Sequence, residues 1–333
     1  MPVIKTDELS FRLREHSIRP ETGQLLMARI SGSDQEDDLS EPPNCQGYGR
    51  IRHFRMQTPS LWPANPLPML PASHRLNLPV EYVMNAQVFQ NAACNWRCWY
   101  CYVPFNLLAA NERNAGWLTA EQLVNLYLAE NDRPLILDCS GGQPDLIPEW
   151  IPWMMAGLRA RGVSEKVYLW SDDNLSNDFL WRYLTLEQRR DIAGYRNYGR
   201  VCCFKGFNSD SFAFNTKADP MLFERQFELF TRLLALDLDI YAYATFTATT
   251  DAGIVHDMAD FVDRLQIIHR NLPLRLVPLR IENYGVVQSR VGPQQQTALT
   301  VQENAIMAWN EQIEARFGED ERQVPIPNVS LWG

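Results

Sequence analysis

Apolar and polar positions alternate in a regular way from about residue 82 onward. Short apolar runs predict six strands, and stretches with apolar residues every three or four positions predict helices between them. The strands are expected at residues 82–89, 134–140, 166–171, 200–205, 239–247 and 274–281. The helices are expected at residues 119–129, 149–160, 177–186, 221–236 and 254–268, with another at about 301–317. Thr119 followed by Gln122 is typical of a capping box at a helix start.

Strand–helix repeats of this length predict an α/β fold of parallel strands joined by right-handed crossovers. Six such units favour either a doubly wound sheet or an incomplete barrel. The repeats occupy residues 81–285, and a C-terminal helix and tail occupy residues 286–333.

Residues 1–80 have a different composition. They hold ten of the 21 prolines and the acidic stretch at residues 34–38. Proline interrupts helices and central strands, so this segment is expected to be an irregular arm, partly mobile and partly packed on the main domain. Trp62 and the apolar residues 67–70 are expected to anchor it.

The chain is acidic, with 31 Lys and Arg against 40 Asp and Glu and a net charge of −9. This balance argues against non-specific nucleic-acid binding, and the local basic group of Arg50, Arg52, His53 and Arg55 is too small to change that. No apolar run reaches the ~18 residues that cross a bilayer. With no apolar stretch of signal-peptide length at the start, a soluble cytoplasmic protein is expected.

The seven cysteines, an odd number, argue against a secreted disulfide framework. Cys94, Cys98 and Cys101 stand together in NAACNWRCWYCYVPF, directly after the first predicted strand. Thiolates suit zinc or an iron–sulfur cluster. Zinc would need a fourth ligand at short spacing, and the nearest later candidates are Cys139 and His256. Three ligands therefore fit a 4Fe–4S cluster with one open iron; the alternative is three ordinary buried cysteines.

This C-x3-C-x-aromatic-C segment, with Tyr100 at the aromatic position, resembles the signature of the radical S-adenosylmethionine (radical SAM) superfamily. The resemblance covers residues 82–285 and implies a partial (β/α)6 barrel with SAM across its C-terminal face. It implies that the open iron is chelated by the amino and carboxylate groups of SAM. An electron from an external flavodoxin- or ferredoxin-type donor would break the C–S bond, and the resulting 5′-deoxyadenosyl radical would abstract a substrate hydrogen.

The ends of the next strands supply further candidates for SAM binding. The resemblance implies that Gly141, Gly142 and Gln143, in the place of the family's GGEP, contact the SAM amino group, although Gln143 lacks the usual charge. Ser171 and Asn174, with Asp172 behind them, are candidates for the ribose or carboxylate; a plain turn is the alternative. Lys205 could pair with the SAM carboxylate or be solvated.

That fourth strand shows some similarity to activase-like members of the superfamily, but Cys203 replaces the Asp of their Asp-x-Lys triplet. Cys202 and Cys203 are adjacent, so they are expected to point to opposite faces of the strand. The fifth strand alternates with period two, which predicts a ligand cavity lined by Tyr243 and Thr245 or, alternatively, a half-exposed strand. At the sixth strand, Arg280 could hold a substrate carboxylate or pair with Glu282.

The sequence thus favours a radical SAM enzyme that abstracts hydrogen from a protein or peptide. The alternatives are the same chemistry on a small molecule, and a non-catalytic iron–sulfur or zinc module. The N-terminal arm is expected to be unnecessary for the cluster, because all three cysteines lie beyond residue 90. Deleting residues 1–40 is therefore expected to spare the cluster, and Gly142→Val is expected to weaken SAM binding while leaving the cluster intact.

Overall fold

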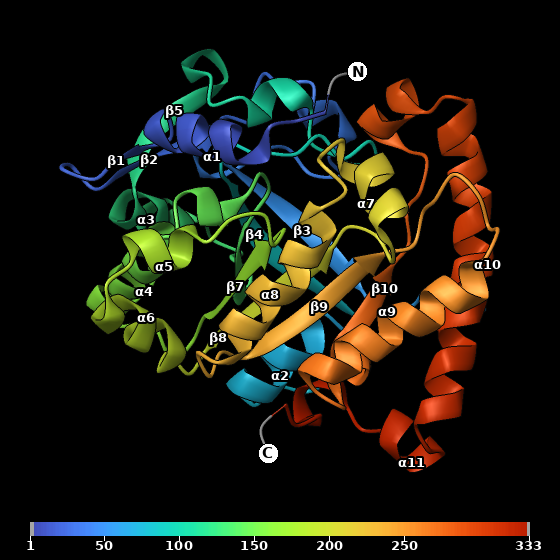
Figure 1. Cartoon of the computed structure of the whole chain (residues 1–333). Helices are drawn as coiled ribbons and strands as arrows, with labels where there is room; N and C mark the ends of the chain where they lie inside the picture. Colours follow the sequence, from blue (N-terminus) through green and yellow to red (C-terminus); the bar gives the residue numbers. More distant parts are fainter. Residues whose placement is uncertain (1–2, 332–333) are drawn as a thin grey trace.

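A seven-stranded, mostly parallel sheet lies at the centre of the chain. The computed structural model describes residues 3–331. The strands stand in the order β10-β9-β8-β7-β6-β4-β3, and they curl into an open half-barrel (Figure 1). Their bounds are β3 Gly49–Arg55, β4 Val83–Gln90, β6 Ile136–Ser140, β7 Tyr168–Asp173, β8 Tyr198–Phe204, β9 Ile240–Thr245 and β10 Leu276–Leu279. All neighbours pair in parallel except β3, which pairs with β4 antiparallel at one edge.

The six strands expected from the sequence are the six parallel strands, with ends that differ by a few residues. Helices follow them on one face of the sheet: α3 Ala120–Ala129, α4 Trp150–Ala160, α8 Leu222–Leu234, α9 Ile254–Ile268 and α10 Pro293–Arg316. The capping box of Thr119 and Gln122 at the start of α3 is confirmed. Between β8 and α8 lies the shorter α7 (Ser209–Thr216).

Two predicted helices have different bounds in the structure. The helix expected at 177–186 is two helices, α5 (Phe179–Tyr183) and α6 (Leu186–Ala193). The backbone becomes extended at Leu184, and the Thr185 side chain caps α6, which starts a new helix instead of continuing the first. Helix α10 begins at Pro293, earlier than expected, because proline is compatible with the first turn and the polar run after it carries no apolar pattern.

The two faces of the sheet bury different kinds of residue. On the helix-covered face, Ile240, Ala242, Ala244 and Phe246 of the β9 segment join the large apolar core with α8 and α9. On the concave face, Tyr241 and Tyr243 join a smaller core that includes α2 (Met69–Leu76) and Ile326. This second core closes the barrel near the N-terminal ends of the strands and leaves the other end for the site.

Residues 1–80 are more regular than the sequence predicted. They contain α1 (Thr6–Glu15), β1 (Ile18–Arg19), β2 (Gln24–Ala28), β3 and α2. The prolines at residues 42–68 lie mostly in connecting loops, and Pro71 lies in the first turn of α2, where a proline is tolerated. Strands β1 and β2 form a small antiparallel sheet with β5 (Ala115–Thr119). Because β3 extends the main sheet, the division expected at residue 80 passes between two hydrogen-bonded strands.

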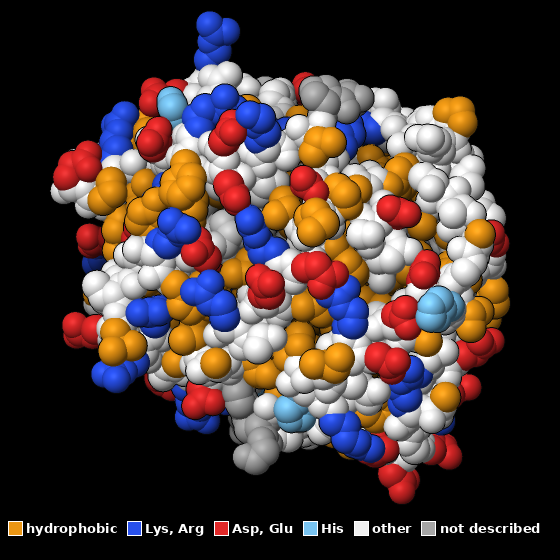
Figure 2. Space-filling view, viewed as in Figure 1, with side chains coloured by type: hydrophobic (Ala, Val, Ile, Leu, Met, Phe, Trp, Pro, Cys, Tyr) orange, Lys and Arg blue, Asp and Glu red, His pale blue; other side chains and the backbone are white. Residues whose placement is uncertain are grey.

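The outer surface mixes charge types. Figure 2 shows acidic and basic side chains interspersed on the face that it presents, with apolar side chains scattered among them. None of the helices in residues 3–331 is long and apolar enough to span a lipid bilayer.

Candidate functional site

Cys94, Cys98 and Cys101 line one cavity at the C-terminal ends of the parallel strands. The cavity has a volume of about 630 Å³, within the range of roughly 300–1,000 Å³ that is usual for small-molecule sites. All three cysteines are half-buried, and none of the seven cysteines forms a disulfide. The segment that carries them leaves the sheet directly after β4. The predicted convergence of these three side chains is therefore seen in the structure.

The backbone of the cysteine segment is fixed by contacts from several elements. The amide of Cys94 donates to the Leu108 carbonyl at 3.1 Å, and that of Cys101 donates to the Cys98 carbonyl at 3.0 Å. The Arg290 guanidinium donates to the carbonyls of Cys101 and Val103. These bonds fix the backbone that carries the three thiols.

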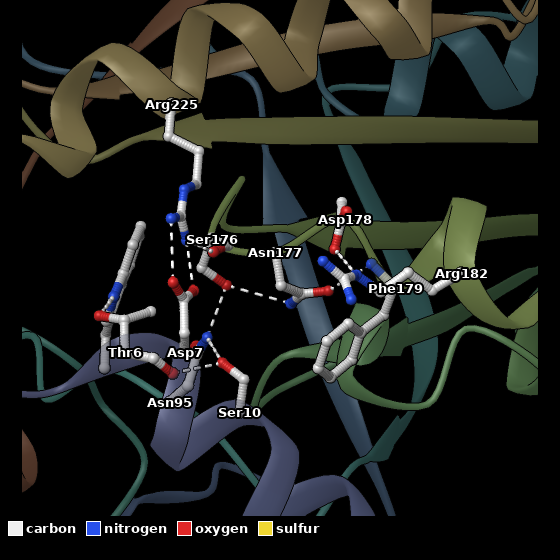
Figure 3. A network of polar contacts seen from close by, with 11 residues as sticks. Thr6, Asp7, Ser10, Asn95, Ser176, Asn177, Asp178, Phe179, Arg182 and Arg225 are labelled. Atoms are coloured by element: carbon white, nitrogen blue, oxygen red, sulfur yellow. Dashed lines mark hydrogen bonds and ion pairs between the residues drawn. The ribbon is translucent and has the colours of Figure 1, made fainter.

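Helix α1 also holds this segment, as Figure 3 shows. Asn95, which is fully buried, donates to Ser10 of α1 at 2.8 Å and to Ser176 at 2.7 Å. The Trp96 indole donates to the Thr6 hydroxyl at 3.1 Å. The N-terminal segment therefore contacts the cysteine segment directly, which could not be expected from the sequence.

Helix α1 is also tied to the helical layer, through a residue in its first turn and one in its last. Asp7 forms an ion pair with Arg225 of α8. The buried Arg14 guanidinium binds both oxygens of Glu149, just before α4, and the carbonyl of Leu146. Helix α1 is thus clamped between the cysteine segment and the helical layer.

The three thiols have the chemistry of an iron–sulfur ligand set. Within residues 3–331, no three Cys, His, Asp or Glu side chains are arranged to hold a single metal ion. Cluster cysteines bind different irons, so they stand farther apart than the ligands of one ion. Burial raises the pKa of Cys98 to about 12, with Lys205 acting against that rise. Because a coordinating metal deprotonates its thiol, that raised pKa does not prevent binding.

The paired glycines after β6 lie directly against the cysteine segment. Gly141 and Gly142 both have left-handed backbones, with φ of +77° and +66°. A Cβ on Gly142 would lie 2.4 Å from the carbonyl oxygen of Ala93. The backbone amide of Gln143 donates to that same carbonyl at 2.7 Å. Both glycines line the cavity. Gly142 allows the close approach of the cysteine segment, whereas a Cβ on Gly141 would meet the Gln90 side chain of β4.

Two predicted site residues have side chains that do not line the cavity. The Gln143 side chain is buried. It donates to Asp173 and accepts from the backbone amide of Asn174. The Ser171 hydroxyl is buried against the Tyr198 hydroxyl at 2.7 Å. Ser171 pairs in register with Cys139 of the helix-facing core, so strand alternation turns its neighbour Asp172 toward the cavity instead.

The remaining predicted residues do line the cavity: Tyr100, Asn174 and Lys205. The side-chain amide of Asn174 donates to Asn95 at 3.1 Å and lies 4.0 Å from the Cys94 sulfur. The Tyr100 hydroxyl accepts a hydrogen bond from Thr245 at 3.0 Å. Burial lowers the pKa of Lys205, but the adjacent Cys203 thiol and Tyr100 phenol outweigh it and raise this pKa well above its ordinary value.

The inward face predicted for the fifth strand is confirmed for Tyr243, which lines the cavity and donates to Asn65 at 3.0 Å. Cys202 and Cys203 do lie on opposite faces: Cys202 belongs to the helix-facing core and Cys203 to the concave core. Arg280 lies in the cavity wall, with its nearest carboxylate in Glu303 at 3.6 Å rather than in Glu282.

Sequence reasoning missed a polar group on the concave face. Arg50 and Arg52 of β3 line the cavity, and Arg52 lies 3.7 Å from the fully buried Asp138 of β6. Burial and the neighbouring Asp172 raise the pKa of Asp138 to about 7, while Arg52 opposes that rise. Period-two alternation in GRIRHFR, read as a strand, is the signal that could have placed these arginines on one face.

Comparisons with known proteins add little. No protein-family model matches the sequence. No curated protein matches it either. Among solved structures, Streptococcus suis SuiB bound to precursor peptide SuiA matches with a TM-score of 0.37 and 15% identity. SuiB bound to S-adenosylmethionine matches with a TM-score of 0.37 and 16% identity.

The SuiB alignments cover 53% of this chain and 36–37% of SuiB, so the chain matches little more than a third of that protein. A likeness of this size carries no weight for the function of the chain.

Proposed function

We propose that this chain is a radical SAM enzyme built on a partial (β/α)6 barrel. The observation that carries the proposal is the meeting of three free thiols with a paired-glycine turn, Asn174 and Lys205 in one cavity. The carboxyl ends of parallel strands are where such barrels place their chemistry. The spacing of the cysteines, with Tyr100 at the aromatic position, is the second support.

In this proposal Cys94, Cys98 and Cys101 hold a 4Fe–4S cluster. When bound and reduced, the cluster supplies one electron that breaks the SAM C–S bond, giving methionine and a 5′-deoxyadenosyl radical that takes a hydrogen atom from the substrate. An external donor of the flavodoxin or ferredoxin type supplies the electron. The chain itself positions the thiols, binds SAM and keeps water from the radical.

The residues around the thiols have distinct roles toward SAM. Gly141 and Gly142 line the cavity beside the cysteine segment, and the backbone of this turn contacts the SAM amino group. The Lys205 ammonium pairs with the SAM carboxylate. Asn174 donates from beside Cys94, and Asp172 takes the ribose role that the sequence suggested for Ser171. Tyr100 supports this wall through its bond with Thr245.

The substrate proposed from the sequence is a protein or peptide. One observation favours the alternative, a small molecule. Residues Gln35, Asp38, Leu39 and Ser40 of the N-terminal segment form part of the cavity wall, so this segment covers part of the space above the sheet. A cavity of about 630 Å³ suits a small molecule or one residue of a peptide better than a folded protein surface.

Anaerobic reconstitution tests the proposal. We expect about four irons per chain and a broad visible absorption that bleaches on reduction. Replacing Cys94, Cys98 or Cys101 by Ala should abolish both signals. Replacing Cys202, which faces the helices, is the matched control and should leave them unchanged. Stoichiometric zinc in thiolate coordination would contradict the proposal and favour a non-catalytic zinc module.

A further inference from the structure

Strand β3 presents arginines to the cavity from the edge of the sheet. Arg50 pairs in register with Val88 and Arg52 with Ala86, a residue of the concave core. Directly paired residues of antiparallel strands point to the same face. Arg50 and Arg52 therefore lie on the concave face, where both contribute to the cavity wall.

Both guanidinium groups have unused donors. Arg50 is 4% exposed and donates to the Tyr102 hydroxyl at 3.0 Å, while its Nε finds no hydrogen-bond partner in residues 3–331. Arg52 lies over the Phe54 ring, and its nearest carboxylate is Asp138 at 3.7 Å, too far for a hydrogen bond. Buried donors are normally satisfied, so the unpartnered Nε of Arg50 points to a ligand with acceptor oxygens, and the half-buried Arg52 beside it can donate to the same ligand.

The cavity is more basic than the chain that encloses it. Five cationic side chains, those of Arg50, Arg52, Arg55, Lys205 and Arg280, line it. Three acidic side chains line it, those of Asp38, Asp172 and Glu282. The whole chain has a net charge of −9, so this local excess of positive charge is a feature of the cavity itself. A recessed basic wall concentrates anions.

The arginines and Lys205 reach the cavity from different parts of the sheet. In the order of the sheet, β3 and β8 are separated by β4, β6 and β7. Because the sheet is curled, these cations face a shared space, and the Asp172 carboxylate lies within the electrostatic reach of both Arg52 and Lys205. Different strands can therefore supply cations to different groups bound in one cavity.

We propose that Arg50 and Arg52 form a substrate subsite for a carboxylate or phosphate group. This proposal rests on the function proposed above, because the hydrogen donor must share the cavity with SAM. The planar guanidinium fork matches both carboxylate and phosphate oxygens. Arg280, at the end of β10, lies in the same cavity and has an Nε without a hydrogen-bond partner in the described residues. The substrate class is thus an organic anion, held by its charged end at β3.

Calorimetric titration of the full chain with pyrophosphate, and separately with citrate, tests the subsite. Wild-type protein should bind at least one of the two. Binding of pyrophosphate would indicate a phosphate site, and binding of citrate would indicate a carboxylate site. Arg52→Gln should weaken that binding at least tenfold. Arg190→Gln, on the exposed side of α6, is the matched control and should bind like the wild type.

Removing Arg52 alone leaves the buried Asp138 without its cation, so the single variant could fail to fold. Arg52→Gln combined with Asp138→Asn removes both charges and should show the same loss of anion binding. The subsite would be overturned if the wild-type protein bound neither anion. It would also be overturned if both variants bound the anion as tightly as the wild type. An equal loss of SAM binding by the reconstituted Arg52→Gln protein would also overturn it, because Arg52 would then serve SAM.

The two proposals fail in different ways. Anion binding that depends on Arg52, in a protein that takes up no iron, would contradict the radical SAM function and leave the anion site standing. Iron uptake and SAM cleavage without anion binding would contradict only the subsite.

Discussion

The buried amide of Asn95 donates a hydrogen bond to the hydroxyl of Ser10, 85 residues earlier in the chain, at 2.8 Å. Asn95 follows the first cysteine of the site directly, and Ser10 lies in α1. The first helix of the chain is therefore part of the support for the thiols.

Asn95→Ala should reduce both stability and iron uptake. The substitution removes bonds to Ser10 and Ser176, and it leaves the side-chain amide of Asn174 without its acceptor, at a cost of about 1–3 kcal/mol. Thermal unfolding and iron content after reconstitution are the measurements. Asn177→Ala is the matched control: Asn177 is buried in the same network and bonds Ser176 and the Phe179 amide, but not the cysteine segment. It should lower stability and spare iron content; equal iron content in both variants would contradict the role of Asn95.

Deletion of residues 1–40 should abolish iron uptake, contrary to the expectation from sequence. It removes α1 and also β2, whose Leu26 carbonyl accepts from the Ala92 amide beside the cysteine segment. Iron content of the truncated protein, normalised to the folded fraction by circular dichroism, checks this. Full iron content in a folded truncated protein would restore the view of residues 1–40 as a dispensable arm.

Gly142→Ala should destabilise the protein and lower iron content. Its Cβ would lie 2.4 Å from the Ala93 carbonyl oxygen, next to Cys94, so the cysteine segment would have to move. From the sequence, a substitution at Gly142 was expected to weaken SAM binding and leave the cluster intact. The structure predicts an effect on the cysteine segment as well. Gly162→Ala is the matched control, because Gly162 has the same φ of +66° with nothing within 4 Å. It should cost only the backbone strain, about 1–2 kcal/mol, and leave iron content unchanged.

Lys205→Ala should weaken SAM binding by about 10- to 150-fold, the equivalent of roughly 1.5–3 kcal/mol for a charged hydrogen bond. Anaerobic calorimetry with SAM measures it, with iron content as the check that the cluster is intact. Lys166→Ala, an exposed lysine before β7, is the control. Unchanged affinity in the Lys205 variant would remove this residue from the SAM site.

The parallel strands and most of the helices could be predicted because their signals are local. Thr119 and Gln122 are three residues apart, and the cysteines share one short loop, so no long-range information was needed. Ser171 was misplaced because the strand runs to Asp173, beyond its predicted end, and alternation then assigns Asp172 to the cavity.

The role of the N-terminal segment could not be predicted because it depends on contacts between distant parts of the chain. Nothing near Ser10 indicates that its partner is Asn95, and nothing near Arg52 indicates that Asp138 lies across the sheet. The proline content of residues 1–80 suggested irregular structure. In the structure most of these prolines lie in the loop before β3 and in the loop between β3 and α2, so they do not interrupt the strands.

The most direct test of the central claim is the product of SAM in the reduced, reconstituted enzyme without substrate. In the proposed function SAM binds the cysteine-held cluster without needing the substrate. We therefore expect slow formation of 5′-deoxyadenosine and methionine in equal amounts, detected by liquid chromatography with mass spectrometry. The Cys98→Ala variant should form neither. Formation of S-adenosylhomocysteine alone, or no turnover by protein with a full complement of iron, would contradict the assignment of this chain as a radical SAM enzyme.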